Sequence, residues 1–163
     1  MGAADGSIFT RHTVSAGGFD ISYLKGGADG ELDPVLYLHG MGGGGKWEAF
    51  HMALGTTAMT YAPQLPGWRE SQVPEGISSV EDYAGVVVEL LDALELDRLT
   101  LAGHSIGGWI ALKVASRHPE RISSLILSGV MGLDVPSAPT PIPILSENPE
   151  LYFSCNVLSG MRG

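Results

Sequence analysis

The stretch that decides the fold is residues 99–108, which read Leu-Thr-Leu-Ala-Gly-His-Ser-Ile-Gly-Gly. Its first four residues are a short apolar run typical of a buried strand, and residues 106–117 have the pattern of a helix that Pro119 ends. One glycine stands two residues before Ser105 and another stands two residues after it, which is the pattern G-x-S-x-G. We therefore predict a sharp strand-to-helix turn with Ser105 at its apex.

The spacing of these glycines has a steric explanation. A serine at so tight a turn has strained backbone angles, and side chains two residues away on either side would collide. The helix that begins at Ile106 also directs its positive N-terminal end at Ser105 and favours negative charge there. We prefer a nucleophile to the simpler interpretation, in which Ser105 only caps the helix.

A second motif supports the first. His-Gly-Met-Gly at residues 39–42 directly follows the apolar run Val35–Leu38, which predicts a strand buried on both faces. A backbone turn there can direct an N–H group at the same point as the N–H of Ile106. Two converging backbone donors form an oxyanion hole, which stabilises charge that develops in the transition state. A flexible glycine loop is the alternative, and the serine turn downstream favours the oxyanion hole.

Strands and helices alternate along the rest of the chain, which predicts an α/β fold with a mostly parallel sheet and helices on both faces. The helix around residues 80–94 is expected to begin with a capping box of Ser78 and Glu81. Four prolines between residues 136 and 143 predict a linker, so we divide the chain into a core, 1–133, and a second segment, 134–163. The other expected elements are a hairpin in 7–24, a helix at 46–54, a strand at 58–62 and a buried strand at 125–127.

Composition argues against several partners. The net charge of −9 disfavours nucleic acid and anionic membrane surfaces, because both attract Lys and Arg. Cys155 is the only cysteine, so no internal disulfide can form, and the first residues do not resemble a signal peptide. No apolar run has the length of a membrane span. We expect a cytoplasmic protein with no metal, because no Cys, His and carboxylate cluster has ligand spacing, and with no organic cofactor.

Three motifs in order resemble the signatures of the α/β-hydrolase superfamily, in the branch of esterases and meta-cleavage-product C–C hydrolases. They are Leu-Tyr-Leu-His-Gly at 36–40, Ala-Pro-Gln-Leu-Pro-Gly-Trp-Arg-Glu-Ser at 62–71, and residues 103–108; the likeness covers 7–132. It implies that Ser105 is the nucleophile, that the N–H groups of Met41 and Ile106 form the oxyanion hole, and that the substrate is a small ester-like molecule. Gln64 stands where these proteins usually have Asp, a departure that affects one loop hydrogen bond.

The catalytic base is missing from this pattern. In the superfamily the chain order is Ser, then Asp or Glu, then His. His118 lies at the far end of the helix that starts after Ser105, about 20 Å away at a rise of about 1.5 Å per residue, and the other histidines are His12, His39, His51 and His104. We assign none of the five as the base. Asp134 is a candidate acid, although a loop residue is the better interpretation, and we expect acid and histidine beyond Gly163.

The resemblance also sets expectations for the architecture and activity. Six core strands are accounted for by Leu127, whereas the superfamily has eight, so the last strands and most of the cap are expected to be absent. Residues 134–163 then resemble the start of the cap, and the chain alone is expected to be inactive. The alternative from another class is a non-catalytic binding protein or receptor with the hydrolase fold. A nucleotide-binding domain is disfavoured because Lys46-Trp47 follows the glycines where a P-loop has Lys and then Ser or Thr.

Overall fold

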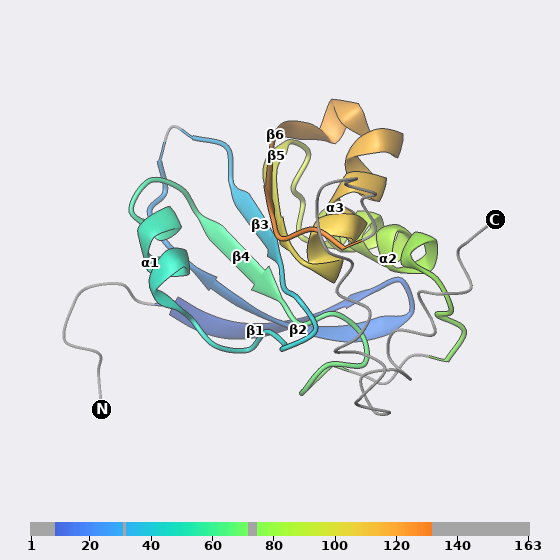
Figure 1. The fold of residues 1–163 in the computed structure, drawn as a ribbon. Coiled ribbons are helices and arrows are strands. Elements are labelled where there is room, and N and C mark those ends of the chain that lie inside the picture. Colours follow the sequence, from blue (N-terminus) through green and yellow to red (C-terminus); the bar gives the residue numbers. More distant parts are fainter. Residues whose placement is uncertain (1–8, 31, 72–74, 132–163) are drawn as a thin grey trace.

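A six-stranded sheet forms the centre of the computed structural model, which describes residues 9–30, 32–71 and 75–131 (Figure 1). The strands are β1 (Phe9–Ala16), β2 (Phe19–Gly26), β3 (Val35–Leu38), β4 (Thr60–Pro63), β5 (Leu99–His104) and β6 (Ile122–Ser128). The helices are α1 (Ala49–Gly55), α2 (Val80–Ala93) and α3 (Ile106–Arg117), and a 3-10 turn, η1 (Pro119–Arg121), precedes β6.

The strand order is β1-β2-β4-β3-β5-β6. β1 and β2 form the predicted hairpin, whose turn residues Gly17 and Gly18 both have positive φ, at 57° and 81°. β2 pairs antiparallel with β4, and the pairs β4–β3, β3–β5 and β5–β6 are parallel. The expected α/β fold with a mostly parallel sheet is therefore confirmed. Because β3 and β5 are parallel neighbours, the loops that follow them leave from the same edge of the sheet.

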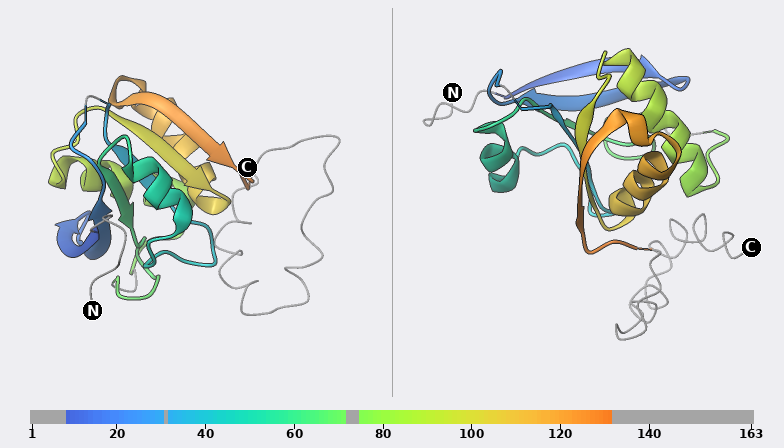
Figure 2. Two further views of the ribbon diagram at one scale, coloured as in Figure 1. Left: turned by 90° about the vertical axis from the view of Figure 1, so that its left-hand side faces the viewer. Right: turned by 90° about the horizontal axis from the view of Figure 1, so that it is seen from above.

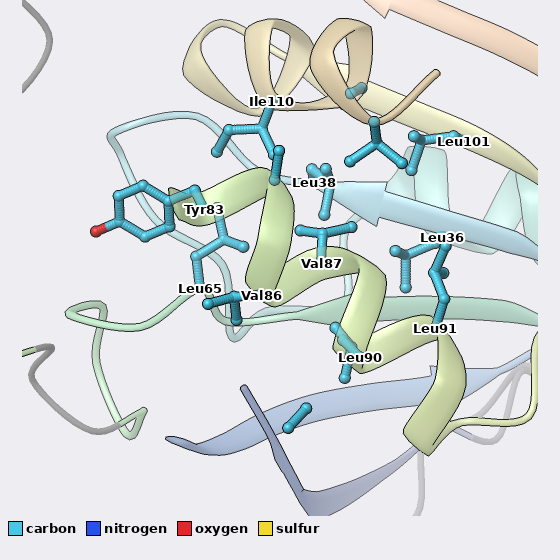
Figure 3. Close-up of a cluster of buried hydrophobic side chains, with 14 of the residues drawn as sticks. Leu36, Leu38, Leu65, Tyr83, Val86, Val87, Leu90, Leu91, Leu101 and Ile110 are labelled. Atoms are coloured by element: carbon cyan, nitrogen blue, oxygen red, sulfur yellow. The ribbon is translucent and has the colours of Figure 1, made fainter. Parts of the chain in front are cut away.

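Helices cover both faces of the sheet. α1 lies on one side, and α2 and α3 lie on the other (Figure 2). Apolar residues of α2 recur at helical spacing and are buried against β3 and α3, as the side chains of Val87, Leu90, Leu36, Leu38 and Ile110 show (Figure 3). This cluster is the main core, and it fixes α3 against the strands that carry the candidate site.

The start of α2 differs from the predicted capping box by one residue. Ser79 is the N-cap, and its hydroxyl accepts a hydrogen bond from the N–H of Asp82 at 3.1 Å. Ser78 instead donates its own N–H to the Asp82 carboxylate at 2.8 Å. Glu81 does not cap the helix, because its carboxylate pairs with two cations of α3, Lys113 and Arg117, each at 2.7 Å. The capping box of Ser78 and Glu81 was therefore a wrong prediction, and α1 likewise begins at Ala49 rather than at residue 46.

β6 is an edge strand within the described residues, and its burial was also predicted wrongly. It pairs only with β5. The side chains of Leu125, Ile126 and Leu127 are 36%, 48% and 37% exposed, although the run is as apolar as a buried strand. Apolar composition reports the tendency to be buried, and it cannot show whether a neighbouring element is present to bury the strand.

The contrast between β5 and β6 can be tested by side-chain truncation. Leu101 on β5 is completely buried, and Ile126 on β6 is 48% exposed. We expect Leu101→Ala to lower the free energy of unfolding by about 2–5 kcal/mol, because it leaves a cavity. Ile126→Ala should cost less than about 1 kcal/mol in urea titrations of the 163-residue chain. Equal losses would contradict the exposed position of Ile126.

Candidate active site

The parallel pairing of β3 and β5 brings the two predicted motifs together. Leu38 at the end of β3 is paired with Gly103 at the end of β5. The turn that starts at His39 and the turn at Ser105 therefore leave the sheet side by side. The contact is so close that a Cβ atom on Gly40 would lie 2.9 Å from Cδ2 of His104 and 3.1 Å from Cβ of Ser105. A side chain at residue 40 would therefore crowd the side chains of His104 and Ser105.

Ser105 has the strained backbone predicted for the apex of the turn. Its φ is 56° and its ψ is −119°, a conformation that residues other than glycine rarely adopt. Four hydrogen bonds hold it: the Ser105 N–H donates to the Ser128 carbonyl at 3.0 Å, and its carbonyl accepts from the N–H groups of Gly108, Trp109 and Met131 at 3.1–3.2 Å. Strain of this kind persists where the surroundings over-determine the backbone, and it is typical of functional sites.

Both glycines of the G-x-S-x-G motif are required by close backbone contacts. A Cβ atom on Gly103 would lie 2.5 Å from the carbonyl oxygen of Gly107. A Cβ atom on Gly107 would lie well inside contact distance of the carbonyl oxygens of Leu38 and His39. The steric explanation of the spacing is thus confirmed, with one refinement. The atoms in the way belong to the backbone, and those near Gly107 come from the other motif.

The turn after β3 is braced from outside. The indole N–H of Trp68 donates to the Met41 carbonyl at 3.2 Å, and the N–H of Gly43 donates to the Gly40 carbonyl at 3.0 Å. Ile106 opens α3, where first-turn N–H groups have no partner within the helix. The structure thus places Met41 just after the Gly40 contact and Ile106 just after Ser105. Their assignment as the oxyanion hole stays a prediction.

His39 is a structural residue of this turn. It is buried, its Nε2 accepts a hydrogen bond from the Leu65 N–H at 3.1 Å, and its Nδ1 then donates to the Gly40 carbonyl at 2.7 Å. Burial lowers the pKa of His39, and the bond to Gly40 opposes that shift in part. The ring is therefore neutral near pH 7 with both nitrogens in use. It ties the turn to the loop that follows β4.

Gln64 makes the loop hydrogen bonds in place of the usual Asp. The side chain is completely buried, and its Oε1 accepts from the Glu70 N–H at 3.0 Å. Its main-chain carbonyl accepts from the Ser71 hydroxyl at 2.6 Å, and that hydroxyl oxygen accepts from the Ser22 N–H at 3.2 Å. The departure from the superfamily pattern therefore preserves the loop and adds an amide NH₂ group that an Asp would lack.

All five histidines lie within the described residues, and none forms a hydrogen bond with the Ser105 side chain. His104 donates from Nδ1 to the Ser128 carbonyl at 3.1 Å, and His12 contacts Thr10 on β1. His51 is buried in α1, where its Nδ1 accepts a hydrogen bond from the Glu48 N–H at 3.0 Å. His118 follows α3 and pairs with Glu120 at 3.5 Å. Asp134, Cys155 and the predicted segment 134–163 lie outside the described residues.

The described ranges contain no candidate metal site and no helix that could span a membrane. Among residues 9–30, 32–71 and 75–131, no three His, Cys, Asp or Glu side chains are grouped so that they could hold a metal ion. The helices in this part of the chain are too short or too polar to cross a membrane.

Known proteins resemble this chain in both sequence and fold. A family model described as the alpha/beta hydrolase fold matches residues 33–150. The chain is 36% identical over 125 residues to a 2-hydroxy-6-oxo-2,4-heptadienoate hydrolase of Pseudomonas putida, which covers 74% of this chain and 44% of that protein. It is 35% identical over 120 residues to a 1-acylglycerol-3-phosphate O-acyltransferase of Rattus norvegicus, which covers 68% of this chain and 34% of that protein. A crystal structure of a membrane phospholipase A, described as a bacterial virulence factor, superimposes with a TM-score of 0.76 at 30% identity, over 90% of this chain and 50% of that one.

A mostly parallel sheet with a strained serine between β5 and α3, facing a glycine turn after β3, is the arrangement of the α/β-hydrolase class of folds. The family match covers well over half of the residues. The chain therefore belongs to the α/β-hydrolase fold family. It spans 44% and 34% of the length of the two curated relatives and 50% of the phospholipase chain.

The close contact at Gly107 can be tested against a second helical glycine. We expect Gly107→Ala to lower the free energy of unfolding by about 1–3 kcal/mol, because the new methyl group meets carbonyl oxygens that cannot move aside. Gly85 is exposed on α2 and a Cβ there meets nothing within 4 Å. Gly85→Ala should therefore raise stability by about 0.5–1 kcal/mol. Urea titration measures both, and a gain for Gly107→Ala would refute the steric argument.

Proposed function

We propose that Ser105 is the nucleophile of a serine hydrolase that acts on an ester or a related acyl or C–C bond of a small molecule. The observation that carries this proposal is the left-handed backbone of Ser105, held between β5 and α3 against the glycine turn at residue 40. A helix N-cap role would not require this conformation, because N-cap residues normally have extended backbone angles. The strain is explained if the hydroxyl has to be presented to a substrate.

The reaction would proceed through an acyl-enzyme. The Ser105 Oγ attacks the substrate carbonyl carbon while its proton passes to a base, and the carbonyl oxygen becomes an oxyanion. The N–H groups of Met41 and Ile106 stabilise that oxyanion. The intermediate collapses, the leaving group departs with the proton from the base, and water then releases the acyl group. For a C–C bond, the order of bond cleavage and serine attack is left open.

The base and its acid complete the proposal. Each of the five histidines is held elsewhere by the contacts described above, so we propose that the base is a histidine outside this set of five. Asp134 is retained as a candidate acid, with a residue beyond Gly163 preferred. Residues 134–163 are proposed as the start of a cap over the site. On this proposal the 163-residue chain alone has no useful turnover.

The names of the relatives fit a shared acyl chemistry with different acceptors. One is a C–C hydrolase, another is an acyltransferase, and a third is a phospholipase A. A serine that forms an acyl-enzyme can pass the acyl group to water or to another hydroxyl. The proposal therefore specifies the attacking group and leaves the substrate to the cap and later loops, which shape the pocket in proteins of this kind.

The test compares the 163-residue chain with the protein isolated from its natural source, whose intact mass is first set against 17.1 kDa. Hydrolysis of p-nitrophenyl esters is measured for both, with Ser105→Ala in each. If the natural protein is longer, we expect turnover that Ser105→Ala reduces by at least about a thousandfold. The short chain should give at most the small rate above water that an oxyanion hole alone supplies.

Two results would contradict this proposal. Full activity of Ser105→Ala in the natural protein would exclude Ser105 as the nucleophile. Rapid turnover by the 163-residue chain would show that one of its own five histidines is the base. If the natural protein instead has a mass of 17.1 kDa and no turnover, the non-catalytic binding protein becomes the better description, because no base then exists in the same chain.

A further inference from the structure

A cavity of about 150 Å³ lies beside the loop of residues 42–45, which we call the glycine loop. Its walls come from the glycine loop, the ends of β3 and β4, and His51 of α1. Ser105, Met41 and Ile106 are not among the residues that line it. The cavity is therefore distinct from the position proposed for the nucleophile.

The charged side chains of the cavity wall carry a net positive charge. Lys46 and Arg69 line it, and neither forms an ion pair with any residue that the structure describes. Glu48 is the one acidic residue on the wall, so the lining carries +2 − 1 = +1 in a chain whose net charge is −9. Arg69 lies along the glycine loop, because a Cβ on Gly43 would be 3.2 Å from its Nε. An anion is the ligand that this charge favours.

Two buried N–H donors beside the glycine loop have no hydrogen-bond partner in the described part of the chain. His51 lines the cavity and is 3% exposed, and its Nδ1 accepts from the Glu48 N–H at 3.0 Å. Burial lowers the pKa of His51 to about 4, so the ring is neutral near pH 7 and its proton is on the unpaired Nε2. The second donor is the Gln64 amide, which uses Oε1 for Glu70 and leaves Nε2 unpaired next to Gly45.

Unpaired polar atoms are concentrated in this region. Four buried side-chain atoms form no hydrogen bond among the described residues. Three are N–H donors, those of His51, of Gln64 and of Trp47, whose ring is stacked on His51. The fourth, Oε2 of Glu81, is held instead by an ion pair with Arg117 at 2.7 Å. Because a buried unpaired donor costs free energy, a local excess of donors indicates an acceptor.

The backbone of the glycine loop alternates in the sign of φ. Gly43 and Gly45 have positive φ, at 94° and 83°, whereas Gly42 and Gly44 do not. Alternation between positive and negative φ also occurs in the backbone concavities that bind anions. The N–H of Gly43 already donates to the Gly40 carbonyl at 3.0 Å, so it is not one of the donors offered to a ligand. A Cβ on Gly44 would lie 2.8 Å from the His39 ring, so the loop packs tightly on one side. A Cβ on Gly42 would meet nothing within 4 Å, which leaves the other side open.

We propose that this cavity binds a small oxyanion, a carboxylate or a phosphate group, between the glycine loop and the side chains of Lys46, Arg69 and His51. The two cations supply the charge, and the neutral N–H donor of His51 supplies direction. Gln64 lies against Gly45 and is not on the cavity wall, so its amide reports on the loop. A metal cation is disfavoured, because the unpaired groups are donors and the only carboxylate is that of Glu48. The proposal does not depend on the hydrolase reaction, since it uses none of the residues assigned to catalysis.

The test is a titration of the ¹⁵N-labelled 163-residue chain at pH 7 with sodium acetate and, separately, with sodium phosphate. Sodium chloride at matched ionic strength is the control. The signals followed are the Nε2–H of His51 and the side-chain NH₂ of Gln64, together with the melting temperature. We expect saturable shifts of both signals and a rise in Tm with at least one oxyanion, beyond any effect of chloride.

Matched variants test the role of the cations. Lys46→Gln and Arg69→Gln should each weaken binding at least about tenfold, because each removes a charge-assisted contact. Arg98→Gln is the control: it also removes an exposed cation, whose contact with Asp33 is a loose 3.8 Å. All three are exposed, and far-UV circular dichroism without added oxyanion checks that each variant is folded.

Each outcome decides the proposal. Shifts with acetate alone identify a carboxylate site, and shifts with phosphate alone identify a phosphate site. If neither acetate nor phosphate gives saturable shifts, the proposal is wrong. Equal weakening by Arg98→Gln and the two cavity variants would also overturn it, because binding would then follow the net charge of the chain.

Discussion

The contact between two backbones, at the ends of β3 and β5, is the constraint on which the site depends. Gly40 approaches Ser105, and Gly107 approaches the carbonyl oxygens of Leu38 and His39, at distances that leave no room for a side chain. Both contacts follow from the register that pairs Leu38 with Gly103 in neighbouring parallel strands. The turn at Ser105 and the glycine turn are therefore one packed unit, although more than sixty residues separate them in the sequence.

The segment after β4 acts as a brace for that unit. His39 accepts the Leu65 N–H, Trp68 donates to the Met41 carbonyl, and Tyr83 of α2 donates to the Pro66 carbonyl at 3.1 Å. These are polar contacts between the main chain and buried or half-buried side chains, which are stronger and more directional in the interior than at the surface. The motif at residues 62–71 therefore has a structural role, because its hydrogen bonds hold the glycine turn in place.

Most of the fold could be predicted from the sequence, because its decisive elements are local. The strand Val35–Leu38 and the helix Ile106–Arg117 have the predicted bounds, and the strained Ser105 follows from two glycines and their neighbours. Two wrong predictions, the capping box and the burial of β6, concern features that depend on residues distant in the sequence. Glu81 forms ion pairs with Lys113 and Arg117 on α3 instead of capping α2. The exposure of Leu125–Leu127 depends on whether another element covers β6. The unpaired donors of His51 and Gln64 depend on tertiary packing, so no pattern in the sequence indicates them.

The hydrogen bonds of Ser105 have a consequence for the lifetime of the site. Its N–H and its carbonyl are both bonded to the last residues of the described chain, Ser128 and Met131, at the end of the edge strand. Edge strands with few covering contacts unfold locally at a low cost in free energy. Each such opening would remove two of the four hydrogen bonds that hold the backbone of Ser105, whereas the bonds from Gly108 and Trp109 of α3 would remain. In the described part of the chain, the strained conformation of Ser105 is therefore coupled to the local unfolding of β6 as well as to the packing of α3.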